Sequence, residues 1–130
     1  MLTLKGALGT CGSDYLTCIC GKSPDLLSES FCIVLLEISS NYKDIFSDAI
    51  DIDFASGKIE FVSFKNIGND AMDFSGSNVE IYDSNLENVK DKLISGGEES
   101  NIKISKIYAV NSKSGIISKD GSKVYAKDIF

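Results

Sequence analysis

The sequence predicts an all-β fold, a parallel β-helix in which short strands coil into stacked rungs. A segment of about 22 residues recurs four times, with copies starting at positions 48, 70, 91 and 114, which are 22, 21 and 23 residues apart. Inside each copy apolar and polar residues alternate, as in a strand with one buried face. Gly, Ser, Asn or Asp bounds each strand, and these residues favour turns. Because such short strands cannot bury a face alone, the copies must stack, with each strand pairing in parallel with its equivalent in the next copy.

The first 46 residues carry the faintest repeat. Gly6–Leu8 with Ser13–Cys20 can be read as one degenerate rung and residues 23–38 as the next, although the same stretch could instead form a cap with a helix. All four cysteines lie here, and their spacing lacks the paired CxxC knuckles of a zinc site. We expect small buried or free thiols, with disulfides and a zinc site as weaker alternatives. The cysteines are Cys11, Cys18, Cys20 and Cys32.

Residues 48–130 carry the clear repeats and complete one predicted domain over 1–130. The first copy predicts strands over 48–54, 56–61 and 64–67, and later copies repeat this order. We expect about five to six rungs, which the spacing of paired strands makes roughly 25 to 30 Å tall. Superposed apolar positions would form three inward ladders: Ile50, Met72, Leu93 and Ile116; Ile59, Val79, Ile102 and Val124; Phe64, Leu86, Ile107 and Ile129.

The composition is that of a globular domain with two absences. Apolar residues make up 43% and charged residues 25% of the 130, but there is no His, and all 13 basic residues are Lys, so Arg is missing too. The chain therefore has no imidazole base or ligand and no planar guanidinium to clamp phosphate or carboxylate. A net charge of −6 argues against nucleic-acid binding, which needs clustered cations.

Neither a membrane span nor an export signal is predicted. The longest apolar run, Phe31–Leu36, has about a third of the ~20 residues that a spanning helix needs. Met1–Gly12 holds one Lys and too short an apolar block for a signal peptide. The residues alone leave the compartment unknown.

Aspartates recur at matching positions of the repeats. We expect Asp51 to stack on Asp73 in the next rung, with Asp53 nearby, at the ~4.8 Å spacing of paired strands. Alternation with the apolar positions points these side chains to solvent. Carboxylates this close repel unless something compensates, and Ca²⁺, which takes several oxygen ligands, is one remedy. Asp51, Asp53 and Asp73 are therefore the candidate metal ligands, and Ca²⁺ is the only cofactor suggested.

A second set of aspartates stands at the first position of the first three copies of the repeat: Asp48, Asp70 and Asp91. Its simplest interpretation is structural, because Asp at the start of a turn accepts backbone N–H bonds. For Asp51, Asp53 and Asp73, this structural interpretation is the alternative to the metal site. Lys92, beside Asp91, is expected to be a solvated turn lysine, and a base with a lowered pKa is the alternative.

The repeats carry a family resemblance. The segments DAIDIDF at Asp48–Phe54, GNDAMDFSG at Gly68–Gly76 and DKLISGGE at Asp91–Glu98 resemble right-handed parallel β-helix repeat proteins of the pectin-lyase-like superfamily. They look most like bacterial non-catalytic β-helix regions attached to larger surface or exported proteins. The resemblance implies a right-handed helix, an extracellular or cell-surface location and recognition of carbohydrate. Hydrolases of the superfamily combine clustered Asp with Gly-His-Gly and Arg-x-Lys, and its Ca²⁺-dependent lyases use an Arg base, so the missing His and Arg argue against catalysis.

The sequence thus predicts a non-catalytic structural or binding module that recognises carbohydrate or a protein partner. The alternative is a divalent-metal-dependent lyase or hydrolase of acidic glycans that uses the three candidate ligands. Phe130 falls in mid-rung, and an open rung exposes unpaired backbone and apolar core, so we expect a homo-oligomer formed through a terminal rung, or a piece of a longer protein. Four tyrosines offer sugar-stacking surfaces, although their positions do not superpose: Tyr42, Tyr82, Tyr108 and Tyr125.

Overall fold

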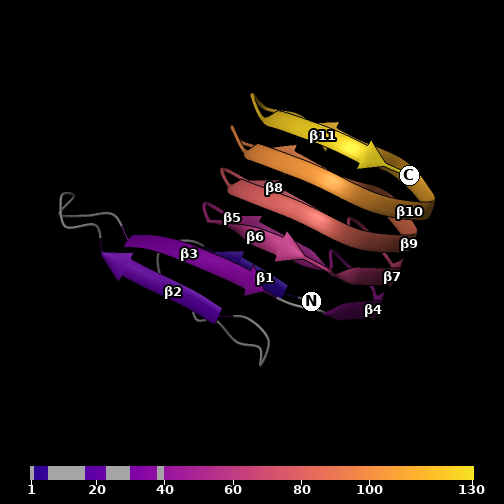
Figure 1. Cartoon of the computed structure of the whole chain (residues 1–130), viewed down its shortest axis with the longest axis horizontal. Helices are drawn as coiled ribbons and strands as arrows, with labels where there is room; N and C mark the ends of the chain where they lie inside the picture. Colours follow the sequence, from indigo (N-terminus) through magenta and orange to yellow (C-terminus); the bar gives the residue numbers. More distant parts are fainter. Residues whose placement is uncertain (1, 6–16, 23–29, 38–39) are drawn as a thin grey trace.

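The computed structural model describes residues 2–5, 17–22, 30–37 and 40–130, and it shows a β-solenoid (Figure 1). The coil makes about four turns with a spacing of about 22 residues, which confirms the predicted parallel β-helix class. Among the described residues there is no helix long and apolar enough to cross a membrane. The strands are β1 (Leu2–Lys5), β2 (Thr17–Lys22), β3 (Ser30–Glu37), β4 (Asn41–Ile45), β5 (Ile50–Asp53), β6 (Ser56–Glu60), β7 (Ser63–Ile67), β8 (Met72–Ser75), β9 (Asn78–Gly97), β10 (Asn101–Ser118) and β11 (Lys123–Ile129).

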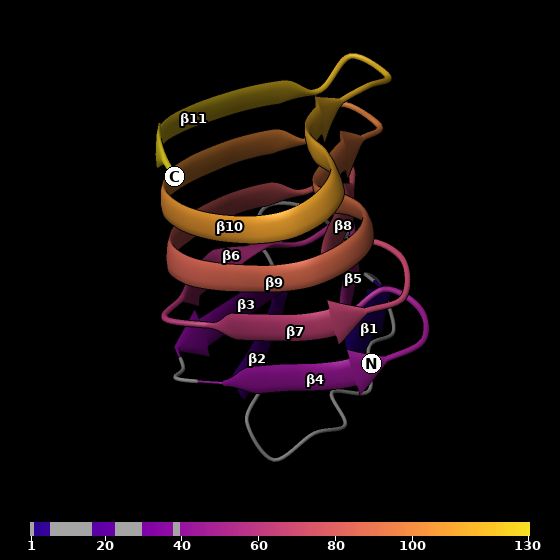
Figure 2. The ribbon, with the colours of Figure 1, turned by 90° about the vertical axis from the view of Figure 1, so that its right-hand side faces the viewer.

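Parallel pairing divides the solenoid into three walls. Wall A joins β1, β5, β8 and the last parts of β9 and β10. Wall B joins β3, β6, the first parts of β9 and β10, and β11. Wall C joins β4, β7 and the middle parts of β9 and β10. We number the turns from wall C: turn 1 is 41–62, turn 2 is 63–84, turn 3 is 85–107 and turn 4 is 108–129. Figure 2 shows them stacked, from β4 to β11.

The register confirms the ladders in part and corrects the third copy. Ile50, Met72 and Ile116 share one column, but its third member is Ile94, not Leu93. The copy start at Asp91 was therefore one residue early, and the starts at 48, 70, 92 and 114 are evenly 22 apart. Both candidates are apolar and buried, so alternation alone could not choose between them.

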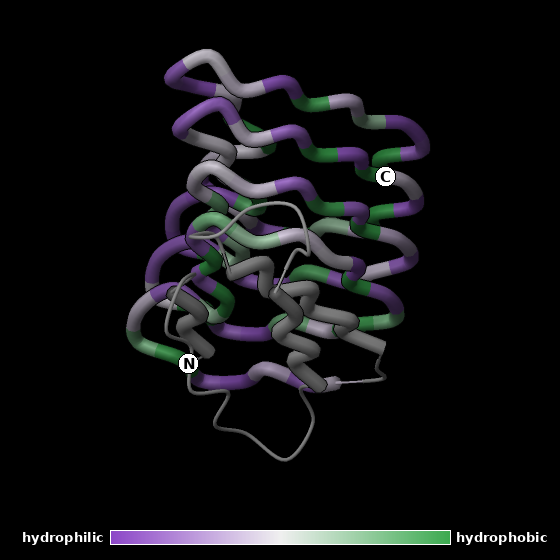
Figure 3. The backbone as a smooth tube through the Cα atoms, turned by 90° about the vertical axis from the view of Figure 1, so that its left-hand side faces the viewer, coloured by the Kyte–Doolittle hydropathy of each residue, from purple (hydrophilic) through white to green (hydrophobic). Residues whose placement is uncertain are grey.

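Two further ladders also need regrouping. On wall B, Ile59 stacks on Ile81 and Ile104, while Val79, Ile102 and Val124 form the adjacent column as predicted. Phe64 stacks on Leu86 and Ile107 stacks on Ile129, as predicted, but these are two separate columns. Leu86 is followed by Ala109, and Ile107 follows Ser84. Figure 3 shows how hydrophobic positions recur from one turn to the next. The core is one cluster whose largest fully buried side chains are Phe64, Phe74, Ile50, Ile59, Ile67, Met72, Ile81, Leu86, Ile94, Ile102 and Ile107.

Left-handed residues form the three corners of each turn. Asn, Asp and Gly tolerate positive φ with little cost, so they recur at these bends. Gly76, with φ of 58°, follows wall A, and an added Cβ there would strike the ring of Phe54. The other two corner columns are Asp44, Asn66, Asn88 and Asn111, and Phe61, Asp83, Lys106 and Asp128.

The N-terminal strands continue the walls only partly. β1 and β3 pair in parallel with β5 and β6, as a preceding rung would, whereas β2 runs antiparallel to β3. Cys18 and Cys20 both lie on β2, and Cys20 is the register partner of Cys32 on β3. The two predicted N-terminal rungs, Gly6–Leu8 with Ser13–Cys20 and residues 23–38, lie only partly within the described residues, and Cys11 lies outside them, so the count of five to six rungs stays a prediction.

Candidate functional site

The predicted metal ligands lie on wall A. Asp51 and Asp73 are register partners on β5 and β8, as expected, whereas the partner of Asp53 is Ser75. All three side chains are half-buried, less exposed than predicted. Asp73 Oδ1 is buried and has no hydrogen-bond partner in the described part of the chain. No group of three or more His, Cys, Asp or Glu there could hold a metal ion, and the calcium site stays a prediction.

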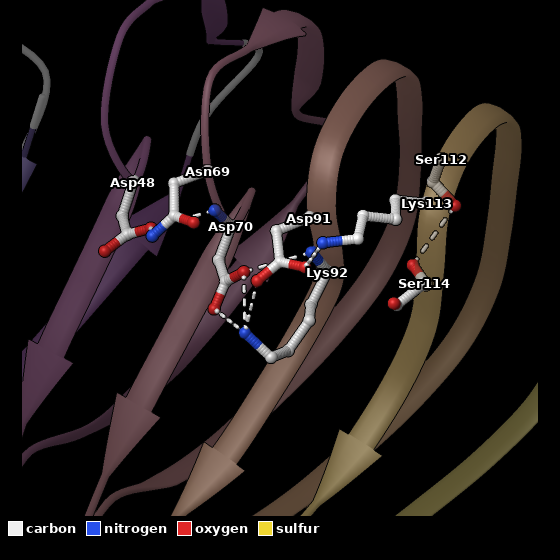
Figure 4. A network of polar contacts seen from close by, with 8 residues as sticks. All are labelled: Asp48, Asn69, Asp70, Asp91, Lys92, Ser112, Lys113 and Ser114. Atoms are coloured by element: carbon white, nitrogen blue, oxygen red, sulfur yellow. Dashed lines mark hydrogen bonds and ion pairs between the residues drawn. The ribbon is translucent and has the colours of Figure 1, made fainter.

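The second aspartate column has a structural role (Figure 4). The backbone N–H of Asp70 donates to Asp48 Oδ1 at 2.8 Å, and that of Lys92 donates to Asp70 Oδ1 at 3.0 Å. Each carboxylate thus accepts a backbone N–H bond, as expected, and the donor lies in the next turn of the solenoid. The third place in this column belongs to Lys92, because Asp91 follows Asn69 in the neighbouring column.

Lys92 compensates the carboxylates around it. Its Nζ lies 3.1 Å from both oxygens of Asp70 and 2.8 Å from Asp91 Oδ2, and Lys113 approaches Asp91 Oδ1 at 3.4 Å. The hydrogen bond to Asp91, followed by that to Asp70, raises the pKa of Lys92, although burial opposes it. The same bond lowers the pKa of Asp91. The prediction of a base with a lowered pKa is therefore wrong for Lys92. The prediction of a solvated lysine is wrong too, since the side chain of Lys92 is only 25% exposed.

A ladder of side-chain amides follows the corner after wall C. Asn66 Nδ2 donates to Asp44 Oδ1 at 2.7 Å, Asn88 Nδ2 donates to Asn66 Oδ1 at 3.0 Å, and Asn111 Nδ2 donates to Asn88 Oδ1 at 3.2 Å. A hollow of about 610 Å³ lies beside this ladder. Because each of these amides donates a hydrogen bond to a side chain in the preceding turn, we interpret this column as structural.

The outer face of wall B carries an open groove of about 530 Å³, which we call the wall B groove. It crosses all four turns, and the first and last strands lie about 14 Å apart at the usual spacing. Outward side chains of two columns line it. They are Lys58, Glu80, Lys103 and Tyr125 in one column, and Glu60, Tyr82, Ser105 and Lys127 in the other.

Most charges in this groove are paired with each other. Lys58 forms an ion pair with Glu60, which raises the pKa of Lys58, and Lys103 Nζ lies 3.1 Å from Glu80 Oε1. Lys127 forms no ion pair with any described residue. The groove therefore offers polar donors and acceptors along its length and one uncompensated cation in turn 4.

The two tyrosines of the groove differ in accessibility. Lys106 Nζ lies over the Tyr82 ring at 4.9 Å from its centroid and 2.6 Å from its Oη, which raises the pKa of Lys106. Phe61 meets the same ring edge-on at 5.9 Å. Tyr125 is 61% exposed, so its ring is the aromatic surface open to a ligand. The two tyrosines lie in different columns, as predicted.

The sequence identified the acids but missed the groove. Its residues are outward, polar and different in type, so alternation marks them only as surface. The predicted stacking of Ile102 on Val124 already places Lys103 beside Tyr125 and Ser105 beside Lys127, but it does not show that these outward side chains line a groove.

Comparison with known proteins places this chain in no group: no family model, no curated protein and no solved structure matches it.

Proposed function

We propose that this chain is a non-catalytic binding module whose wall B groove takes an extended, hydroxyl-rich carbohydrate chain. The observation that carries the proposal is an open groove along a regular sheet, with the exposed Tyr125 ring and the unpaired Lys127 together in turn 4. Aromatic rings stack on the apolar faces of sugars, and paired charges supply hydrogen-bond donors and acceptors for hydroxyl groups. The resemblance of the repeat segments to pectin-lyase-like β-helix proteins points the same way, as an analogy only.

Lys127 refines the ligand class. An ammonium without a protein carboxylate attracts a ligand carboxylate, so a uronic acid at this end of the groove is favoured over a neutral sugar. A strongly anionic polymer is disfavoured, because the whole chain carries a net charge of −6. We therefore propose a polymer with isolated carboxylates among neutral sugars. A protein partner with the same surface chemistry is the competing occupant.

The proposal assigns no glycan cleavage to the groove. Glycosidases use two carboxylic acids, and the acids of the groove, Glu60 and Glu80, each form an ion pair with a lysine. The lysine considered as a base, Lys92, does not line the groove and has a raised pKa. The alternative metal-dependent lyase needs a third ligand beside Asp51 and Asp73, and Asp53 faces Ser75 in register. This alternative gains support only from a calcium effect of the kind tested below.

Affinity electrophoresis tests the proposal with soluble xylan, glucuronoxylan and polygalacturonate. We expect the strongest retardation by glucuronoxylan, and Tyr125→Ala should weaken it at least tenfold, about 1.4 kcal/mol or more. The matched control is Tyr108→Ala, which removes a 45% exposed tyrosine from wall C, outside the groove, and should change retardation less than twofold. No retardation by any polymer, or equal loss in both variants, would overturn the carbohydrate proposal.

A further inference from the structure

The corner after wall C contains a gap in a column of side chains. Phe46, Gly68 and Lys90 occupy the same position in turns 1, 2 and 3, one residue after a column of register partners. Figure 2 shows β4 and β7 ending side by side at this corner. A Cβ at Gly68 would strike the carbonyl group of Phe46, so the backbone of turn 1 excludes any side chain there. The main chain therefore keeps the gap open.

The hollow of about 610 Å³ described above lies at this gap. We call the space lined by the three residues of this column and by the amide ladder the corner hollow. Its volume is within the range of about 300–1,000 Å³ that is usual for small-molecule sites. No described residue lines both the corner hollow and the wall B groove, so the two are separate sites.

The two residues on either side of Gly68 differ in chemistry. The side chain of Phe46, in turn 1, is 100% exposed, so its ring is open to a ligand. Lys90, in turn 3, forms no ion pair with any described residue. Two strand spacings, about 10 Å, separate these two positions. The corner hollow therefore has an apolar ring toward turn 1 and an uncompensated ammonium toward turn 3.

The amide ladder supplies hydrogen bonds along the same distance. Each amide nitrogen carries two hydrogens and each amide oxygen two lone pairs, and a bond between neighbouring turns uses one of each. Asn66, Asn88 and Asn111 therefore each keep a donor and an acceptor beyond those that hold the ladder. Asn66 and Asn111 are exposed and Asn88 is half-buried, so a ligand in the hollow can reach them.

We infer that the corner hollow binds a single uronic acid, a hydroxylated six-membered ring with one carboxylate. The apolar face of the ring packs on Phe46, and the carboxylate pairs with Lys90. Sugar hydroxyl groups both donate and accept hydrogen bonds, and the amides of the ladder offer both functions. Asp44, in turn 1, repels the ligand carboxylate and so directs it toward turn 3.

Two other ligand classes fit the corner hollow less well. A neutral sugar would leave the Lys90 ammonium without a partner. An aromatic carboxylate would find one ring to pack on, because Phe46 is the one aromatic side chain among the described residues that line the hollow. It would also leave most of the amide donors and acceptors without a partner.

Nuclear magnetic resonance titration of the 130-residue chain tests this inference, with glucuronate, glucose and 4-hydroxybenzoate as probes. Glucuronate should shift the side-chain amide signals of Asn66, Asn88 and Asn111 and should bind about tenfold more tightly than glucose. Equal affinity for glucose would overturn the role of Lys90. Tighter binding of 4-hydroxybenzoate would overturn the sugar assignment. Unchanged asparagine signals with every probe would overturn the site itself.

Four surface variants assign the contacts. Phe46→Ala should weaken binding of glucuronate about tenfold, and Lys90→Met should do the same while leaving glucose unaffected. The matched controls are Phe54→Ala, which removes a 65% exposed ring at another corner, and Lys119→Met, which removes an exposed lysine outside the hollow. Each control should change binding less than twofold, and losses equal to those of the test variants would overturn the assignment. Tyr125→Ala should bind glucuronate normally, so a failure here is separable from a failure of the groove.

Discussion

Turns 3 and 4 use the same columns with different side chains. Leu86 in turn 3 is 1% exposed, whereas Ala109 above it is only half-buried. Likewise, the column of Val89 holds Ser112 in turn 4, and the column of Ile104 holds Ala126. In most wall columns the inward side chain of turn 4 is therefore smaller or carries a hydroxyl group. The interior of turn 4 is therefore less apolar than that of turn 3.

The difference teaches how stability is distributed in a solenoid. Each turn buries its inward side chains against the turns on both sides, so its contribution depends mainly on nearest neighbours. Turn 4 has one described neighbour and correspondingly small core residues. Its large apolar side chains are mostly exposed, among them Tyr108, Val110 and Tyr125. The same substitution should therefore cost much more in turn 3 than in turn 4.

The largest effect is expected in the column of Ile94 and Ile116. Ile94 is fully buried between two turns, so Ile94→Ala should lower the free energy of unfolding by about 3–4 kcal/mol, from lost transfer energy and the remaining cavity. Ile116 is half-buried in turn 4, and Ile116→Ala should cost about 1 kcal/mol. Urea denaturation of both variants measures the difference. Equal costs would mean that turn 4 is as well packed as turn 3.

The next largest effect concerns the two lysines that contact Asp91. Lys92 also neutralises Asp70, whose side chain is 4% exposed, so Lys92→Met leaves a buried carboxylate without its cation. We expect a loss of about 2 kcal/mol. Lys113→Met is the matched control, because Lys113 is 72% exposed and its loss should be too small to measure. Urea midpoints that shift equally would contradict a buried role for Lys92.

The stabilisation by this pair should depend on pH in a defined direction. The folded pKa of Asp91 is lowered by Lys92, so its contribution is present above the unfolded pKa of about 3.9 and is lost as pH falls through the folded value. The raised pKa of Lys92 gives a contribution that is present at neutral pH and is lost only as pH rises through the folded value, above about 10.4. The stability gap between wild type and Lys92→Met should therefore be constant from about pH 5 to 9 and shrink below about pH 4. Urea midpoints across that range measure it, and a gap that widens in acid would reverse the assignment.

These contacts also show how far the sequence could predict the structure. The even spacing and the alternation around Ile50, Ile52 and Ile59 specify strands, stacking and period, and all three are confirmed. Leu93 and Ile94 are adjacent and both apolar, so either could face inward, and the predicted register was wrong by one residue there. The inter-turn bonds from Asp48 and Asp70 fix the register in the structure, but they join residues 22 apart and leave no local pattern. The groove was missed although the stacking of Ile102 on Val124 was predicted, because a register does not show the shape of an outer face.

A smaller effect is expected from the buried serine column. Ser77 Oγ accepts the backbone N–H of Ala55 at 3.2 Å and donates to the carbonyl oxygen of Ser75 at 2.9 Å. Ser77→Ala should cost about 1–2 kcal/mol, because a buried N–H loses its acceptor. Ser122 follows Ser100 in the same column, yet its buried Oγ has no partner among the described residues, so Ser122→Ala should be neutral or slightly stabilising. Thermal melts compare the two, and a large loss at Ser122 would show a bond that the column does not otherwise provide.

The smallest effect is expected from calcium. The column that holds Asp51 and Asp73 continues as Ser95 in turn 3 and Ile117 in turn 4, so its acids are confined to the first two turns. With two stacked carboxylates and no third acid in register, we expect the melting temperatures in Ca²⁺, Mg²⁺ and chelator to agree within about one degree. A ligand at a hundred times its dissociation constant adds ~2.7 kcal/mol, a shift of several degrees for a chain of this size. A Ca²⁺-specific rise of that size, lost in Asp73→Asn and kept in Asp48→Asn, would establish the metal site and make turns 1 and 2 the functional part of the solenoid. Without it, the metal-site interpretation of Asp51 and Asp73 would be wrong, and turn 4 keeps the exposed Tyr125 ring and Lys127, which forms no ion pair with a described residue, as what the groove offers to a ligand.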